Sequence, residues 1–115
     1  MRKYLALGMI GISLLTLGAC TTAPPVSDIP AAIANASTPA DHQKIAEYFA
    51  GKAAGYDAEA AFHEKMGRSY VGRIRLDPDP SSWIAHCNSL KRKFAEAAQE
   101  ARALERAHRQ LAEKP

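Results

Sequence analysis

Four histidines and one cysteine in the C-terminal two thirds of the chain are the side chains best suited to chemistry: His42, His63, His86, His108 and Cys87. Imidazole nitrogens combined with a thiolate are donors that suit Zn²⁺ or Cu⁺. A thiol beside an imidazole can also act as a nucleophile, but that reaction needs an orienting third group and a substrate cleft. The sequence contains no His-Glu-x-x-His and no Cys-x-x-Cys motif, so spacing alone identifies no standard site.

Two helices, at about residues 39–71 and 80–113, must position these side chains. Thr38-Pro39-Ala40-Asp41 combines a capping threonine, a proline at the first helical position and an acidic residue at the third. Asp79-Pro80-Ser81-Ser82 repeats the cap-then-proline pattern. No stretch alternates with a period of two for long enough to form a strand, so we expect an all-α fold. The short connection predicts an antiparallel, coiled-coil-like two-helix hairpin over residues 38–115.

Heptad spacing of apolar and aromatic side chains predicts one seam on each helix. The first seam comprises His42, Phe49, Tyr56, His63 and Tyr70, and it is widened by Ile45, Ala46, Ala53, Ala60 and Met66. The second comprises Trp83, Cys87, Leu90, Phe94, Ala97, Ala101, Leu104, His108 and Leu111. With a turn centred near residue 75, the predicted pairs are His42–His108, Phe49–Ala101, Tyr56–Phe94 and His63–Cys87. Off the seams, the same register predicts Asp57 beside Lys93 and Glu59 beside Lys91.

This register defines a candidate metal site for copper or zinc. His63 and Cys87 would form its centre, with His86 and Met66 nearby, and the pair His42 and His108 would form a second level. One hairpin offers two or three ligands at either level, so a dimer would be needed to complete four. The simpler alternative is that the histidines form hydrogen bonds within the seam and Cys87 is a small buried hydrophobe.

The N-terminal residues have the pattern of a secretion signal. Met1-Arg2-Lys3 is a short positive region, and residues 4–17 form an uncharged apolar run that is too short to span a bilayer. Leu17-Gly18-Ala19-Cys20 resembles the lipobox of bacterial lipoproteins. The resemblance implies removal of residues 1–19, attachment of three acyl chains including palmitate at Cys20, and stable membrane anchoring. By the sorting habit of that family, Thr21 after the cysteine implies the outer membrane, with the body facing the periplasm or exported to the cell surface.

Residues 20–37 are expected to form a flexible linker between lipid and hairpin. Pro24, Pro25 and Pro30 stand among small polar residues there, a composition that favours extended, solvated backbone. Residues 31–36 could form a brief helical turn, but their alanine content alone is too little for a stable isolated helix.

The charge balance argues against a nucleic-acid-binding protein. The chain has 15 Lys and Arg residues against 12 Asp and Glu residues. Two of the basic residues, Arg2 and Lys3, lie in the predicted signal peptide, and removing them leaves a nearly neutral mature chain. We therefore expect the membrane, reached through the N-terminal lipid, as a partner and no nucleic acid.

The thin apolar stripes of a hairpin of this size predict a homo-oligomer, in which a dimer of hairpins forms a four-helix bundle. The residues Thr38-Pro39-Ala40-Asp41-His42, His63, His86-Cys87 and Ala107-His108-Arg109 also resemble small Ala-rich proteobacterial envelope proteins with no assigned activity. That resemblance implies a helical envelope lipoprotein. We expect a binding or assembly protein rather than an enzyme. The alternative is a purely structural module, which resembles small coiled-coil envelope lipoproteins that self-associate through heptads.

Overall fold

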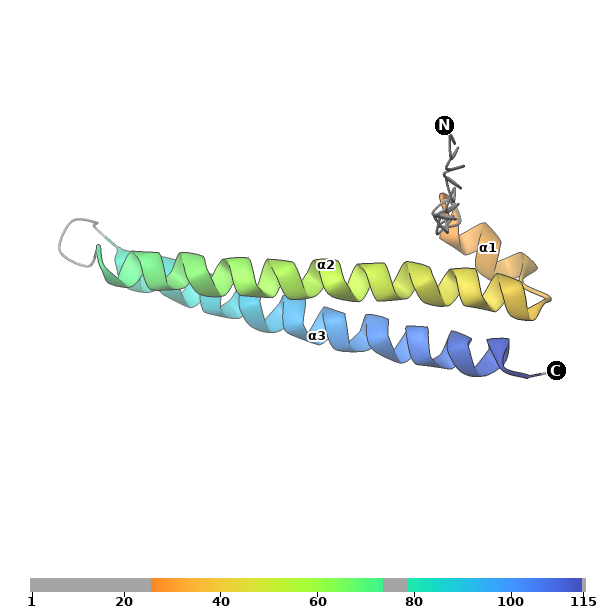
Figure 1. The fold of residues 1–115 in the computed structure, drawn as a ribbon. Coiled ribbons are helices and arrows are strands. Elements are labelled where there is room, and N and C mark those ends of the chain that lie inside the picture. The colour runs from red at the N-terminus through yellow and green to blue at the C-terminus, as the bar shows by residue number, and fades with distance from the viewer. Residues whose placement is uncertain (1–25, 74–78, 115) are drawn as a thin grey trace, which may run out of the picture.

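The computed structural model describes residues 26–73 and 79–114, which form three helices (Figure 1). These are α1 (Ile29–Asn35), α2 (Pro39–Val71) and α3 (Pro80–Ala112). The long helices α2 and α3 run antiparallel and pack against each other along their length, and α1 folds back over the start of α2. The predicted all-α hairpin is confirmed. Residues 1–25, with the predicted signal peptide and Cys20, lie outside the described part.

The starts of α2 and α3 are fixed by side-chain caps. The Thr38 hydroxyl accepts a hydrogen bond from the Asp41 amide, and the Asp41 carboxylate accepts one from the Thr38 amide, which completes a capping box. Hydrogen bonds from the Thr38 hydroxyl, and then from the Ser37 and Thr38 amides, lower the pKa of Asp41. The Asp79 carboxylate accepts from the Ser82 amide at 3.1 Å at the start of α3. These caps explain why both helices begin at a proline.

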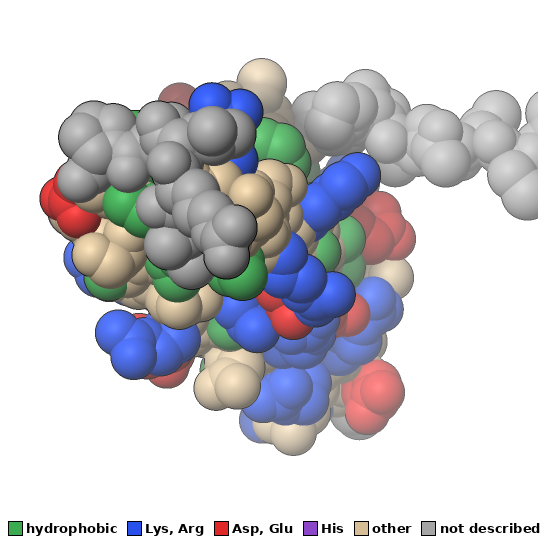
Figure 2. All heavy atoms as spheres, turned by 90° about the vertical axis from the view of Figure 1, so that its left-hand side faces the viewer, with side chains coloured by type: hydrophobic (Ala, Val, Ile, Leu, Met, Phe, Trp, Pro, Cys, Tyr) green, Lys and Arg blue, Asp and Glu red, His purple; other side chains and the backbone are tan. Residues whose placement is uncertain are grey.

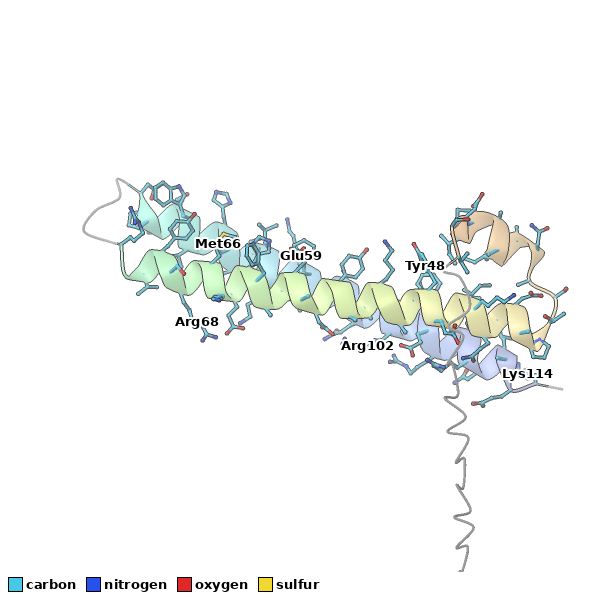
Figure 3. The ribbon with its side chains drawn as sticks, turned by 45° about the horizontal axis from the view of Figure 1, so that its top comes forward. Tyr48, Glu59, Met66, Arg68, Arg102 and Lys114 are labelled. Atoms are coloured by element: carbon cyan, nitrogen blue, oxygen red, sulfur yellow. The ribbon has the colours of Figure 1, made fainter. Side chains whose placement is uncertain are left out.

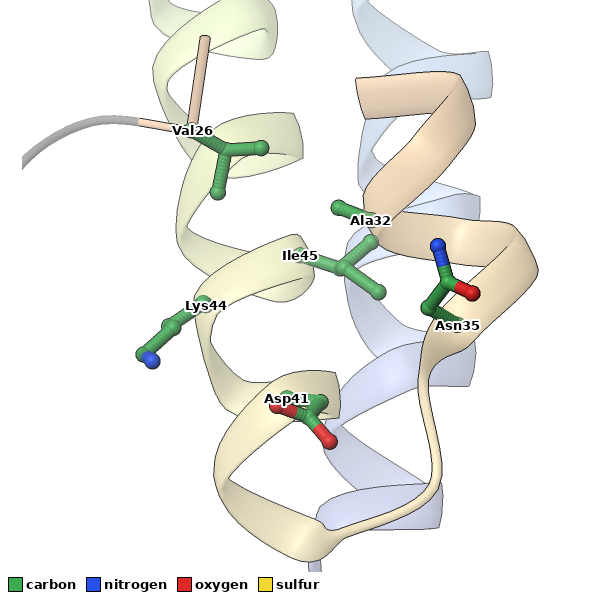
Figure 4. Close-up of a pocket in the computed structure, with 6 residues that line it drawn as sticks. All are labelled: Val26, Ala32, Asn35, Asp41, Lys44 and Ile45. Atoms are coloured by element: carbon green, nitrogen blue, oxygen red, sulfur yellow. The ribbon is translucent and has the colours of Figure 1, made fainter. Parts of the chain in front are cut away.

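Helix α1 corrects the prediction of a flexible linker over residues 20–37. The Asp28 carboxylate caps its first turn by accepting a hydrogen bond from the Ala31 amide at 3.1 Å. Ile45 of α2 is 1% exposed and points toward Ala32 across a small cavity between the two helices (Figure 4). A seven-residue helix is too short to be stable alone, so we attribute its formation to this cap and this apolar contact.

The seam between α2 and α3 is built from small residues. The buried positions are Ala46, Ala53 and Gly67 on α2, and Cys87, Ala98 and Ala101 on α3. Small side chains let two helices approach closely, and they contribute little apolar area each. Among the described residues, no helix is both long enough and apolar enough to cross a membrane.

Candidate functional site

The open end of the hairpin brings two histidines together, as predicted. The Nδ1 atoms of His42 and His108 lie 3.1 Å apart, so one ring donates a hydrogen bond and the other accepts it. The Phe49 ring stacks on His108 with its centroid 6.1 Å away. Burial, followed by the charge of His42, lowers the pKa of His108, which favours the neutral imidazole that the hydrogen bond requires.

The separation of these two nitrogens also suits a metal ion. Two nitrogens bound to a tetrahedral zinc ion at about 2.05 Å lie about 3.3 Å apart. The observed 3.1 Å is close to that value. Within residues 26–73 and 79–114, however, no group of three or more His, Cys, Asp or Glu side chains is placed to hold a metal ion. One hairpin therefore supplies two ligands at this end.

The predicted centre of the metal site, at His63 and Cys87, is arranged differently. The ring of His63 stacks on Phe94, with an interplanar angle of 8° and centroids 5.4 Å apart. Cys87 is 4% exposed and packs against Gly67, where an added Cβ atom would lie 3.3 Å from the Cys87 Cβ. The close partner of the His63 ring is thus an aromatic side chain one heptad beyond Cys87.

The remaining predicted ligands do not gather around Cys87. His86 is exposed on α3, whereas Met66 is half-buried on α2. The Nδ1 atom of His63 is buried and has no hydrogen-bond partner. The buried Cys87 thiol fits the simpler of the two alternatives, whereas the hydrogen bond that this alternative expects of His63 is absent at its Nδ1 atom.

The aromatic contacts lie on one side of the hairpin, which we call the apolar face. On α2 this face consists of His42, Phe49, Tyr56, His63 and Tyr70, and on α3 of Leu90, Ala97, Leu104 and Leu111. The α2 side chains are half-buried, because they lean against α3. The three leucines are 38%, 46% and 38% exposed in chain order, so α2 leaves much of their apolar surface in solvent.

The opposite side of the hairpin, which we call the charged face, carries the ion pairs between the helices. Asp57 pairs with Arg102, and Glu64 pairs with both Arg68 and Lys91. The Arg68 and Lys91 contacts lower the pKa of the Glu64 carboxyl. Tyr48, Glu59 and Met66 project from one side of the hairpin, and Arg68 and Arg102 project from the other (Figure 3). Seen from the left-hand side of Figure 1, the largest group of Lys and Arg side chains lies with Asp and Glu at the lower right of the view, and others lie at its left and top (Figure 2).

The prediction of a single seam on α3 is wrong in one respect. Ala98, which was not assigned to the seam, is fully buried, whereas Leu90, Leu104 and Leu111 are exposed. The cause is a rotation of α3 that brings its alanines against the buried alanines of α2. The predicted stripe on α2 already included Ala46, Ala53 and Ala60, and Gly67 continues this heptad of small residues.

The predicted ion pairs are wrong, because each joins a residue of the charged face to a residue at the edge of the apolar face. Asp57 pairs with Arg102 rather than with Lys93. Lys91 pairs with Glu64, at 3.3 Å, rather than with Glu59. Lys93 and Glu59 are exposed instead, and their heptad positions place them at the edges of the apolar face.

A groove of about 370 Å³ runs along the middle of the apolar face. Its lining comprises Phe49, Lys52, Tyr56, Ala97, Glu100, Ala101 and Leu104. The groove is mostly apolar, with one cationic and one anionic side chain at its edges. The sequence did not predict it, since a single seam would have filled this space with leucine.

Comparison of the chain with protein-family models, with curated proteins and with solved structures found no match.

Proposed function

We propose that this chain is a lipid-anchored envelope protein whose helical hairpin works by self-assembly rather than by catalysis. The observation that carries the proposal is the row of exposed leucines on a helix pair whose own seam is made of alanine and glycine. Soluble proteins rarely leave a contiguous apolar row in water unless it binds something. A two-helix rod also offers little concavity for a substrate, which argues against an enzyme.

The anchor in this proposal is the acylated Cys20. The lipobox-like residues 17–20 support the lipid, and Thr21 supports the outer membrane as the site, with the hairpin in the periplasm or at the cell surface. The linker between Cys20 and α1 would let the hairpin stand away from the lipid surface. A membrane-held protein is restricted to a surface layer, which raises its effective concentration for self-association.

Metabolic labelling tests the anchor. The full chain is expressed in a bacterial host supplied with labelled palmitate, beside the variants Cys20→Ala and Cys87→Ala. We expect label and membrane fractionation in the parent chain and in Cys87→Ala, and loss of both in Cys20→Ala. Equal labelling of the Cys20→Ala chain, or no label in the parent, contradicts the anchor.

A second candidate function is transition-metal binding at the open end of the hairpin. It is favoured by the 3.1 Å separation of the His42 and His108 nitrogens. Two hairpins joined at their open ends, a pairing different from the one inferred below, would be needed to supply four ligands. Elemental analysis of the full chain purified without chelator tests this candidate. We expect zinc or copper in the parent and in His86→Ala, and loss of metal in His42→Ala. A parent chain without metal above background, or metal that persists in His42→Ala but is lost in Cys87→Ala, overturns the assignment to this end.

A further inference from the structure

The leucines and charged side chains of the apolar face are arranged symmetrically, so that a rotation by 180° superposes their pattern on itself. From this pattern we infer that a second copy of the chain covers the face, with each helix lying antiparallel to its own copy around a two-fold axis. The inference rests on the proposed self-assembling function. It specifies the surface through which two copies bind and how their helices are oriented.

The available area is large enough for a stable pair. Each long helix has 33 residues. Such a helix is about 50 Å long and about 10 Å wide, so the face of a helix pair measures roughly 1,000 Å². The seven-residue α1 covers roughly 100 Å² of it at one end. A standard stable interface buries about 800 Å² per partner. The short helix α1 contacts α2 near Ile45, at one end of the face, and leaves the central groove open.

The leucines of α3 are placed symmetrically about Ala97. Leu90 lies seven residues before Ala97 and Leu104 lies seven residues after it. A two-fold axis that passes beside Ala97 therefore sets Leu90 against the partner's Leu104, and Leu104 against the partner's Leu90. The small side chain of Ala97 at the axis allows the two α3 helices to approach closely.

The exposed charges at the edges of the face obey the same symmetry. On α3, Lys93 and Glu100 lie on either side of residues 96 and 97, so the axis sets each opposite the other residue of the partner. On α2, Lys52 and Glu59 lie on either side of residues 55 and 56 and are exchanged in the same way. Each cation then faces a carboxylate, and no like charges meet.

These two centres of symmetry lie at the same level of the hairpin. Tyr56, next to the centre on α2, and Ala97, the centre on α3, line the same groove. Tyr56 also stacks on Phe94, three residues from Ala97, with the ring centroids 6.3 Å apart. A single two-fold axis through the groove therefore pairs the leucines of α3 with each other and the opposite charges of both helices with each other. Among residues 26–73 and 79–114, the charged face has no comparable row of exposed leucines.

Disulfide trapping at the axis tests this arrangement. The full chain carries Cys87→Ala with Ala97→Cys, and a matched chain carries Cys87→Ala with Ala103→Cys, at an exposed position on the other side of α3. After mild oxidation of whole cells, we expect a covalent dimer of twice the chain mass for Ala97→Cys, and none for Ala103→Cys or for the Cys87→Ala parent. Adding Leu104→Lys to the Ala97→Cys chain should lower the dimer yield about tenfold, because a charge enters the centre of the interface.

Circular dichroism of each purified chain distinguishes loss of the dimer from loss of the helices. Leu104 is 46% exposed, so its replacement should leave the helix content unchanged. Absence of the Ala97→Cys dimer in a helical chain overturns the inference. A cross-link to a product of another mass also overturns it, because a different partner then covers the face. Palmitate labelling is a separate measurement, so loss of the anchor and loss of the dimer can be told apart.

Discussion

The two faces of the hairpin hold the helices together by different means. On the apolar face, aromatic rings from α2 lie against rings of α3, as in the contacts of Phe94 with Tyr56 and His63. On the charged face, the helices are joined by exposed ion pairs such as Asp57–Arg102. Exposed ion pairs contribute little to stability, whereas aromatic side chains bury large areas. We infer that, apart from the small-residue seam, the apolar face contributes most of the free energy that holds α2 and α3 together.

Removal of an aromatic ring should give the largest effect. Phe94→Ala should lower the free energy of unfolding by about 2–4 kcal/mol, because it deletes the ring between Tyr56 and His63. The matched change on the charged face, Arg102→Ala, should cost less than about 1 kcal/mol. Urea unfolding of the full chains in mild detergent, followed by circular dichroism, measures both values. Similar losses for the two variants would contradict the division of roles between the faces.

Replacements of glycine by alanine should change the free energy of unfolding by an intermediate amount. They should also show at which glycine the packing against α3 limits the gain in stability. Gly55 has no atom within 4 Å of an added Cβ, so Gly55→Ala should raise the free energy of unfolding by about 0.5–1 kcal/mol through helix propensity alone. Gly67 is buried against Cys87, and a Cβ there would lie 3.3 Å from the Cys87 Cβ. Gly67→Ala should therefore bring a smaller gain or a loss. The same unfolding experiment compares the two, and a larger gain for Gly67→Ala would show that the seam has spare room.

Titration of His108 on the apolar face should give the smallest effect. Burial, followed by the charge of His42, lowers the pKa of His108 in the folded chain, while the unfolded chain titrates near the ordinary value of about 6.5. As the pH falls below that value, the unfolded chain takes up a proton that the folded chain binds less readily. The contribution to stability is therefore present above about pH 6.5 and is lost as the pH falls through the lowered folded pKa.

The measurement is the free energy of unfolding at about pH 7.5 and about pH 5, compared between chains. His108→Gln should reduce the decrease between these two pH values, whereas the exposed His86→Gln should leave the decrease as in the parent. If His86→Gln reduces it instead, the open end of the hairpin is not the source of the pH dependence.

Local signals in the sequence predicted the helix ends well. Thr38 with Asp41, and Asp79 at the second start, act through hydrogen bonds to amides three residues away, so the information lies in neighbouring residues. The pairs His42–His108 and Tyr56–Phe94 were also predicted, because a short connection fixes the levels of two antiparallel helices. The helical state of Ile29–Asn35 was missed, since it involves a contact with Ile45, a residue distant in the chain.

The rotation of α3 about its own axis was harder to predict than which residues of α2 and α3 lie at the same height along the hairpin. Leucine is the stronger apolar signal, yet α3 turns Ala98 inward and leaves Leu104 exposed. Close approach of two backbones at small residues competes with burial of large side chains, and heptad spacing alone does not rank these two arrangements. The candidate site depends on that rotation. With Ala98 turned inward, Ala97 and Leu104 line the groove of the apolar face.

The alanine-rich seam also affects the entropy of folding. Burial of a leucine or isoleucine side chain costs about 0.5–1 kcal/mol in lost rotamer freedom, whereas alanine and glycine have no rotamers to lose. Ala46, Ala53, Gly67, Ala98 and Ala101 therefore become buried without this penalty. Ordering the backbone still costs entropy. Along the seam, almost no loss of side-chain entropy is added to that cost. The hairpin thus partly offsets its small buried area by giving up little side-chain freedom where its helices meet.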